Sequence, residues 1–264
     1  MANKTKNKGG KAALKAARAS VVSKKGPPWG MIAAIAAVLL IAAGVFGYAY
    51  VQIDSVKAFT VSEENKDPSE NIDGVERATY EGSKHVNPDQ RVAYDKTPPY
   101  GGPHDNVWAD CTGVVYPVAV RTENMVHALE HGAVWIAYNP DKVTGPALDT
   151  LKAKVEGQPY MMMSPYPGLD RPISLQSWGH QLKLDDANDE RIDQFIRSLR
   201  SNRFQNPEPG GRCDSSPASF DVSNPPPFVA EAPGPDAVKM DGTGIVPPSS
   251  PAPTPTTTAA KPSK

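Results

Sequence analysis

The stretch VHALEHGAVWIAY, residues 126–138, decides the fold because a helical pattern passes directly into a strand pattern. Apolar residues recur at helical spacing over residues 123–131, with Thr122 as the expected N-cap and Gly132 as the expected terminator. The run AVWIAY that follows is continuously apolar, which is typical of a strand covered on both faces. The stretch therefore predicts a short helix that leads into a central strand.

Helical and strand patterns alternate on both sides of this stretch. The residues predict strands over 113–120, 133–138, 160–163, 173–178 and 181–184, and helices over 123–131, 146–155 and 189–199. This order predicts a mixed sheet with packed helices, which is an α+β fold. An α/β fold of thioredoxin-like topology, with Pro172 opening a late strand, is the alternative.

An uncharged apolar run, GMIAAIAAVLLIAAGVFGYAYV, occupies residues 30–51. At ~1.5 Å per residue it extends about 33 Å, enough for a transmembrane helix in a lipid bilayer. Basic residues lie on its N-terminal side, so we expect that side in the cytoplasm and the rest of the chain outside. A cleaved signal peptide is the competing interpretation, although its apolar part is usually only ~7–15 residues long.

Composition divides the chain further. We expect a basic cytoplasmic tail at 1–29, the transmembrane helix at 30–51, a polar stalk at 52–82, an exported globular domain at 83–215, and a disordered tail rich in Pro, Thr and Ser at 216–264. The stalk is expected because SEENKDPSEN has no apolar periodicity.

The charge distribution argues against nucleic acid as a partner. The chain has a net charge of -1, but residues 1–25 contain eight basic and no acidic residues, which leaves the remainder with a charge of about -9. An acidic surface is unsuited to a phosphate backbone. The basic tail is explained by membrane topology and by contact with anionic lipids.

Cys111 and Cys213 are the only cysteines. Both fall on the expected outer side, where disulfides persist, so we predict that they pair. Two separate thiols, or a bond to another protein, remain open. The spacing excludes a CxxC redox pair.

His127 and His131 are four residues apart on the predicted helix, opposite its apolar side. Two imidazoles at this spacing can bind one metal ion, with Glu130 or Glu123 as a further ligand or as a residue that orients a ring. The alternative is a solvated polar face, in which the helix dipole favours His131 in the last turn.

Other histidines can complete such a site. His104 ends the turn-rich loop TPPYGGPH, and His85 lies in SKHV where the domain is expected to begin. Imidazole ligands suit copper and zinc. His180 follows Trp-Gly at an apparent hairpin turn, where we expect a surface role.

Two further patterns carry less weight. The order H-x-x-E-H over residues 127–131 is that of inverted zinc peptidases, but Gly132 ends the helix too soon for their ligand set. Met161–163 suggest soft copper(I) ligands, yet consecutive strand residues face opposite sides, so filling of a buried strand is the better interpretation.

Several motifs together resemble a bacterial family known as domain of unknown function 3105. They are SKHV, VAYDKTPPYGGPH, VYPVAVRTENMVHALEHGAVWIAYNP and MMMSPYPGLDRPISLQSWGHQLKL, with a helix that ends near FIRSLR. The family's histidine pattern corresponds to His85, His104, His127 and His131. The resemblance implies a single-pass protein of the bacterial cell membrane with an exported domain. Cys111, within WADC, and Cys213 depart from the family pattern.

These observations support two functions. The first is binding of copper or zinc by the exported domain through His104, His127 and His131, with His85 as a fourth ligand. The second is a non-catalytic accessory or scaffolding subunit of a membrane or cell-envelope complex. The sequence contains no Ser/His/Asp order, phosphate loop or haem motif, which favours a protein that is not an enzyme.

Overall fold

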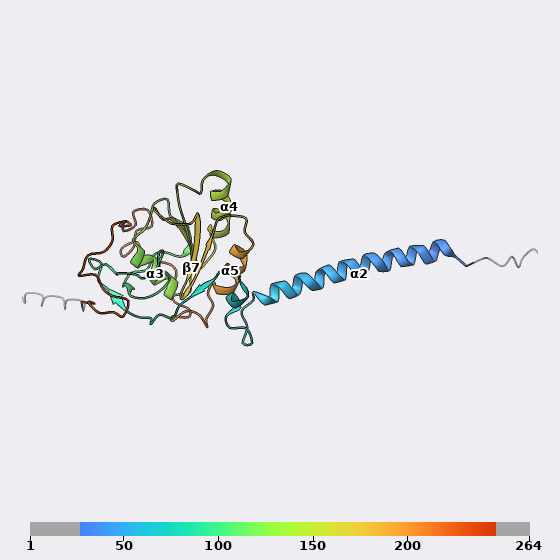
Figure 1. Cartoon of the computed structure of the whole chain (residues 1–264), viewed down its shortest axis with the longest axis horizontal. Coiled ribbons are helices and arrows are strands. Elements are labelled where there is room, and N and C mark those ends of the chain that lie inside the picture. Colours follow the sequence, from blue (N-terminus) through green and yellow to red (C-terminus); the bar gives the residue numbers. More distant parts are fainter. Residues whose placement is uncertain (1–26, 247–264) are drawn as a thin grey trace, which may run out of the picture. The chain divides into compact units, whose positions relative to one another are not determined.

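The computed structural model describes residues 27–246 and divides the chain into two units, Met1–Ser55 and Val56–Lys264 (Figure 1). Most of the predicted basic tail, residues 1–26, lies outside the described residues, as does the end of the predicted C-terminal tail, residues 247–264.

Helix α2, Trp29–Ala58, contains the predicted apolar span. Its part Trp29–Tyr50 has 22 residues and a mean hydropathy of 2.4, so it is long and apolar enough to cross a membrane. A membrane anchor and a signal sequence share these properties.

A six-stranded mixed sheet forms the centre of the second unit, with the order β1-β8-β7-β5-β6-β4. Strands β4, β5 and β6 are mutually parallel, whereas β7, β8 and β1 continue the sheet in antiparallel pairs. The strands are β1 (Glu76–Arg77), β4 (Thr112–Val115), β5 (Val134–Tyr138), β6 (Met161–Pro165), β7 (Ile173–Ser177) and β8 (His180–Leu184). The α+β prediction is confirmed, and the order from β4 to β8 fits the thioredoxin-like arrangement.

Helices cover both faces of this sheet. Helix α3 (Thr122–Glu130) lies on one side of β7, and α4 (Gly145–Val155) and α5 (Arg191–Leu199) lie on the other (Figure 1). Both faces of strand β5 are buried, because Trp135 packs in the α3 layer and Ile136 in the α4–α5 layer. This explains why its sequence is apolar throughout.

The three methionines of β6 follow the same alternation. Met162 packs on the α3 side, and Met161 and Met163 pack on the α4–α5 side. All three are fully buried. They fill the core, as predicted.

Of the two predicted end residues of α3, only the C-terminal one is confirmed. Gly132 follows the helix with a φ of 95°, a conformation that glycine adopts without steric cost, so the predicted terminator is confirmed. The N-cap is Arg121 and not Thr122. The Arg121 guanidinium forms an ion pair with Asp105 and donates to the Gln90 carbonyl at 2.7 Å, which fixes the start of the helix.

Part of the predicted stalk belongs to the domain. Asp67 caps a 3-10 helix, η1 (Pro68–Asn71), and Glu76–Arg77 forms β1 against β8. Polar contacts hold this segment: Asp67 Oδ2 lies 3.2 Å from His180 Nε2. His180 is only 5% exposed, so its expected surface role was wrong.

The predicted disordered tail is also ordered at its beginning. Residues 91–93 and 238 are joined through backbone hydrogen bonds, Val238 N–H to the Arg91 carbonyl and Ala93 N–H to the Val238 carbonyl, both at 2.8 Å. Phe220 is buried, with its ring centroid 6.1 Å from that of Tyr116. Isolated apolar residues among the prolines therefore anchor this segment, although they form no periodic pattern.

Replacing Asp67 with Asn should lower the free energy of unfolding at neutral pH by about 1–2 kcal/mol, because Asn keeps a cap acceptor but removes the charge facing His180. Burial raises the pKa of Asp67, but hydrogen bonds from His180 and Ser69 and the charges of His180 and Arg77 lower it below its ordinary 3.8.

The contribution of the charge is therefore complete above the unfolded-state pKa and disappears as the pH falls through the lower folded-state pKa. Urea unfolding of the full chain in detergent, followed by tryptophan fluorescence, should show the Asp67→Asn deficit at neutral pH and its loss in acid. A deficit independent of pH would contradict this account.

Candidate metal centre

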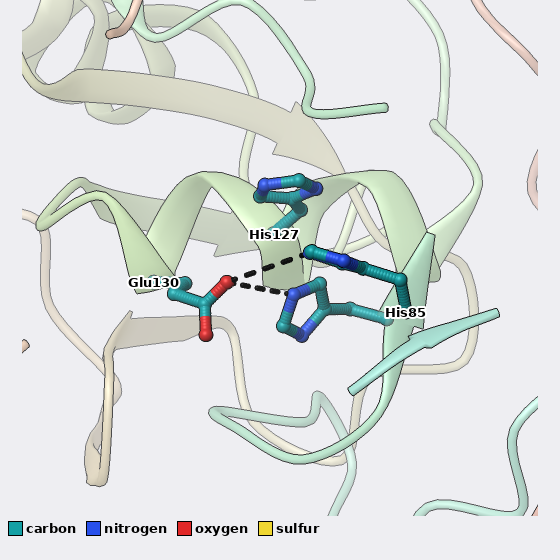
Figure 2. Close-up of side chains that lie close together, drawn as sticks. His85, His127 and Glu130 are labelled. Atoms are coloured by element: carbon teal, nitrogen blue, oxygen red, sulfur yellow. Dashed lines mark ion pairs between the residues drawn. The ribbon is translucent and has the colours of Figure 1, made fainter. Parts of the chain in front are cut away.

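Four side chains, which we call the inner cluster, lie together on the polar side of α3. They are His85, His104, His127 and Glu130, and their ligand atoms all lie within 4.8 Å of one another. Figure 2 shows His85, His127 and Glu130 turned toward one another, with the histidines on two different elements. Of the predicted ligands, His131 lies outside this cluster, and so does Glu123, which instead lies 3.5 Å from Arg121 Nε.

A two-stranded parallel ribbon positions the first two histidines. Strand β2 (His85–Val86) pairs with β3 (His104–Asp105) so that His85 lies opposite His104. The ribbon is held to α3 by the Arg121–Asp105 ion pair, and Asn124 Nδ2 donates to the Val107 carbonyl at 2.7 Å. These contacts place both ribbon histidines above His127.

Backbone carbonyls fix the tautomers of two cluster histidines. His104 Nδ1 lies 2.8 Å from the Gly102 carbonyl oxygen, and His127 Nδ1 lies 2.6 Å from that of Asp105. A carbonyl oxygen only accepts, so each Nδ1 carries a hydrogen and each neutral ring keeps its lone pair on Nε2. Histidines that bind metals are oriented in this way.

The Glu130 carboxylate is oriented by backbone as well. Its Oε1 accepts from the Ser83 N–H at 2.6 Å, and its Oε2 lies 2.9 Å from His104 Nε2 and 3.8 Å from His85 Nε2. This approach requires glycine at position 82, where a Cβ atom would lie 2.7 Å from Glu130 Oε1. One carboxylate oxygen is thus satisfied by the chain, and the other faces the histidines.

The nitrogen His104 Nε2 is the clearest sign of a missing ligand. It is buried, lies 2.9 Å from Glu130 Oε2, and accepts no hydrogen bond from any other group among the described residues. Two ligands of a tetrahedral ion with bonds of ~2.0 Å lie about 3.3 Å apart. The spacing of these two atoms therefore fits a shared cation.

Burial lowers the pKa values of two cluster histidines, His85 and His127, and so favours their neutral forms. Burial lowers the pKa of His127 to about 3, helped by the neighbouring His104 and His131 and opposed by the bond to Asp105. Burial also lowers the pKa of His85, and His104 adds to this effect.

His131 belongs to a second group, which we call the outer group, with Glu208 and the shared His127. The ligand atoms of these three residues also lie within 4.8 Å of one another. His131 Nδ1 lies 2.6 Å from the Arg212 carbonyl oxygen, and its Nε2 lies 2.9 Å from Glu208 Oε2. Sequence reasoning missed Glu208, which lies in a Pro- and Gly-rich stretch without a motif.

The polar side of α3 is covered and not solvated. His127 and His131 are each only 4% exposed. Trp108 lies over both, with ring centroids 5.5 Å from His127 and 4.9 Å from His131. The alternative of a solvated helix face was therefore wrong for both residues.

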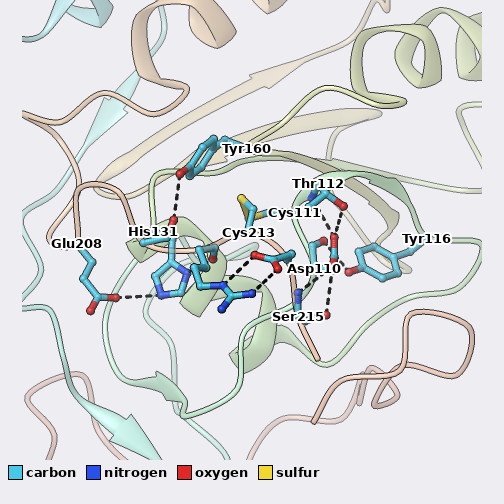
Figure 3. The surroundings of a disulfide bond; sticks show 12 residues. Asp110, Cys111, Thr112, Tyr116, His131, Tyr160, Glu208, Cys213 and Ser215 are labelled. Atoms are coloured by element: carbon cyan, nitrogen blue, oxygen red, sulfur yellow. Dashed lines mark hydrogen bonds and ion pairs between the residues drawn. A yellow bond between two sulfur atoms is a disulfide. The ribbon is translucent and has the colours of Figure 1, made fainter. Parts of the chain in front are cut away.

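A disulfide between Cys111 and Cys213 holds the chain that covers His131, as Figure 3 shows. The two cysteines are 102 residues apart in sequence with Cα atoms 4.7 Å apart, which confirms the predicted pair. The same connection is reinforced by Asp110 Oδ2, which accepts from the Ser215 N–H at 2.9 Å, and by Tyr160, which donates to the Gly211 carbonyl at 3.1 Å.

Fold and site together define a mixed-sheet α+β domain with a buried histidine and glutamate cluster capable of holding a metal ion. The chain belongs to the family described as Protein of unknown function (DUF3105), whose model matches residues 85–215. This range begins at His85 and ends just after Cys213, so it includes the inner cluster and the disulfide. Comparisons with curated proteins and with solved structures give no match.

Replacing both Cys111 and Cys213 with Ser should lower the free energy of unfolding by about 2–5 kcal/mol, because the unfolded chain regains the freedom of the closed loop. Thermal unfolding of the full chain in detergent measures the effect. A reductant should destabilise the parent chain and leave the double variant unchanged. Equal stability of parent and variant without reductant would contradict this role.

Proposed function

We propose that this protein binds one transition-metal ion, Zn²⁺ or Cu²⁺, at the inner cluster, in a domain anchored to the outer side of a bacterial cell membrane. The span Trp29–Tyr50 would be the anchor. The ligands would be His104, His127 and Glu130, with His85 as the fourth.

The convergence of oriented ligand atoms carries this proposal. Backbone carbonyls occupy Nδ1 of His104 and His127, which leaves the Nε2 lone pairs for an ion. Glu130 Oε2 lies 2.9 Å from His104 Nε2, and the ligand atom of His127 lies within 4.8 Å of the others. Buried lone pairs without a hydrogen between them repel unless a cation lies among them. The specific observation behind the proposal is the buried His104 Nε2, which faces Glu130 Oε2 at 2.9 Å and has no other partner among the described residues.

The donor set supports Zn²⁺ or Cu²⁺ over copper(I). Imidazole and carboxylate suit both divalent ions, whereas copper(I) prefers sulfur. Both cysteines are in the disulfide, and Met161–163 are buried in the core. The inner cluster therefore offers nitrogen and oxygen only.

The number of ligands favours binding without catalysis. Four protein ligands fill a tetrahedral site, whereas catalytic zinc sites keep one position open for water or substrate. The inner cluster supplies four. The site would thus hold or carry an ion without activating water.

Two observations support the outer placement. Basic residues precede the apolar span, which favours a cytoplasmic N-terminus. The Cys111–Cys213 disulfide suits an oxidising compartment.

Replacing Glu130 with Gln should weaken binding of Zn²⁺ at least ~10-fold, because an amide is a poorer ligand than a carboxylate. Gln can keep an acceptor for the Ser83 N–H, so the fold should persist. Metal analysis of the full chain in detergent, after dialysis against Zn²⁺ or Cu²⁺, should give one ion per parent chain and less than one per variant. The matched control is Glu81→Gln, an exposed glutamate outside the cluster that should keep the full metal content.

A parent chain that holds no ion, and whose thermal stability a chelator leaves unchanged, would overturn metal binding. That result would favour the accessory or scaffolding role in a membrane or envelope complex. Recovery of such a complex from native membranes would then be the supporting observation.

A further inference from the structure

We infer that the outer group, His131 and Glu208 with the shared His127, is a second cation position through which the ion enters and leaves the inner cluster. This inference rests on the proposed function, because it requires an ion at the inner cluster.

The outer group has ligand geometry of its own. The Arg212 carbonyl fixes the hydrogen of His131 on Nδ1, which leaves the Nε2 lone pair pointing at Glu208 Oε2, 2.9 Å away. His127 completes the group within 4.8 Å. A histidine held by a carbonyl, beside a carboxylate and a second imidazole, is a suitable three-ligand set for Zn²⁺.

The shared histidine makes the two positions exclusive. Nδ1 of His127 is bonded to the Asp105 carbonyl, so only Nε2 can bind an ion. One lone pair binds one ion at a time. The chain therefore holds a single ion, which would pass through the outer position on its way to and from the inner cluster.

The exposure and charge of Glu208 make the outer group the favoured point of entry for a cation. The Glu208 side chain is 57% exposed, whereas those of His127 and His131 are buried. An exposed carboxylate raises the local concentration of a cation. Arg212, the nearest basic residue in sequence, is ion-paired with Asp214 and so does not neutralise Glu208.

The only other exposed member of the two groups is His85, 39% exposed at its side chain. Its imidazole carries no negative charge with which to attract a cation. Entry past Glu208 is therefore favoured over entry past His85.

The transfer is a ligand exchange. The bonds from the ion to His131 Nε2 and Glu208 Oε2 break, those to His104 Nε2, Glu130 Oε2 and His85 form, and the bond to His127 persists. The ion keeps its charge of 2+, and no electron or proton moves. The persistent bond means that the ion is never released during the step.

Stopped-flow uptake of Zn²⁺ by the metal-free full chain in detergent, and its release to an excess of chelator, test this inference. Glu208→Gln should slow both uptake and release by about 10-fold. The variant lies on an exposed side chain, so the fold should persist. The matched control, Glu156→Gln, removes an exposed glutamate charge at the end of α4, outside both groups, and should keep parent rates.

Parent rates in Glu208→Gln would overturn the inference and indicate entry past His85. Loss of stoichiometric binding in this variant would also overturn it, since Glu208 would then be an equilibrium ligand. Two ions per chain would contradict the exclusive use of His127. A parent chain that binds no Zn²⁺ would refute the proposed function itself, which is a separate result.

Discussion

The burial of α3 on both faces is the constraint on which the rest of the structure depends. Its apolar side packs on the sheet through residues such as Met125 and Leu129, as in any amphipathic helix. Its other side carries His127, Glu130 and His131, all of them buried. Buried polar groups cost free energy unless they are hydrogen-bonded, so the surrounding loops have to supply partners.

Those partners come from the backbone. The carbonyls of Asp105 and Arg212 accept hydrogen bonds from His127 and His131. The Gly102 carbonyl does the same for His104, and the Ser83 N–H donates to Glu130. Fixed main-chain partners orient rings more rigidly than flexible side chains would. The backbone of the loops around α3 thus bonds one nitrogen of each of these histidines and one oxygen of Glu130. The other nitrogen or oxygen of each side chain remains available to bind an ion.

Local patterns were enough to predict the core elements. The apolar run at 133–138 corresponds to β5 (Val134–Tyr138), and the helical pattern at 123–131 corresponds to α3. Both could be predicted because a buried strand or helix face requires apolar residues at a regular spacing. The covering of the polar face could not be predicted this way. It is made by segments such as 84–86 and 207–213, which are distant in sequence and have no period.

The same limit explains the other differences. Four histidines and Glu130 were predicted as ligands from residue type and spacing, and four of these five residues meet in the inner cluster. Glu208 has no neighbouring motif, so only the folded chain brings it to His131. Likewise, Asp67 and Val238 join the domain through contacts with residues distant in sequence, which composition does not reveal.

The parallel pairing of His85 with His104 has a consequence for biogenesis. Parallel strands cannot be joined by a tight hairpin turn, so this pair forms only after the intervening loop has folded back. The cluster then needs α3 from further along, and its cover is tethered by Cys213 near the end of the domain. A nascent chain emerging from the ribosome, or one threaded extended through a translocation channel, contains none of this arrangement. In such a chain the four side chains of the inner cluster are far apart, so the cluster exists only in the folded domain.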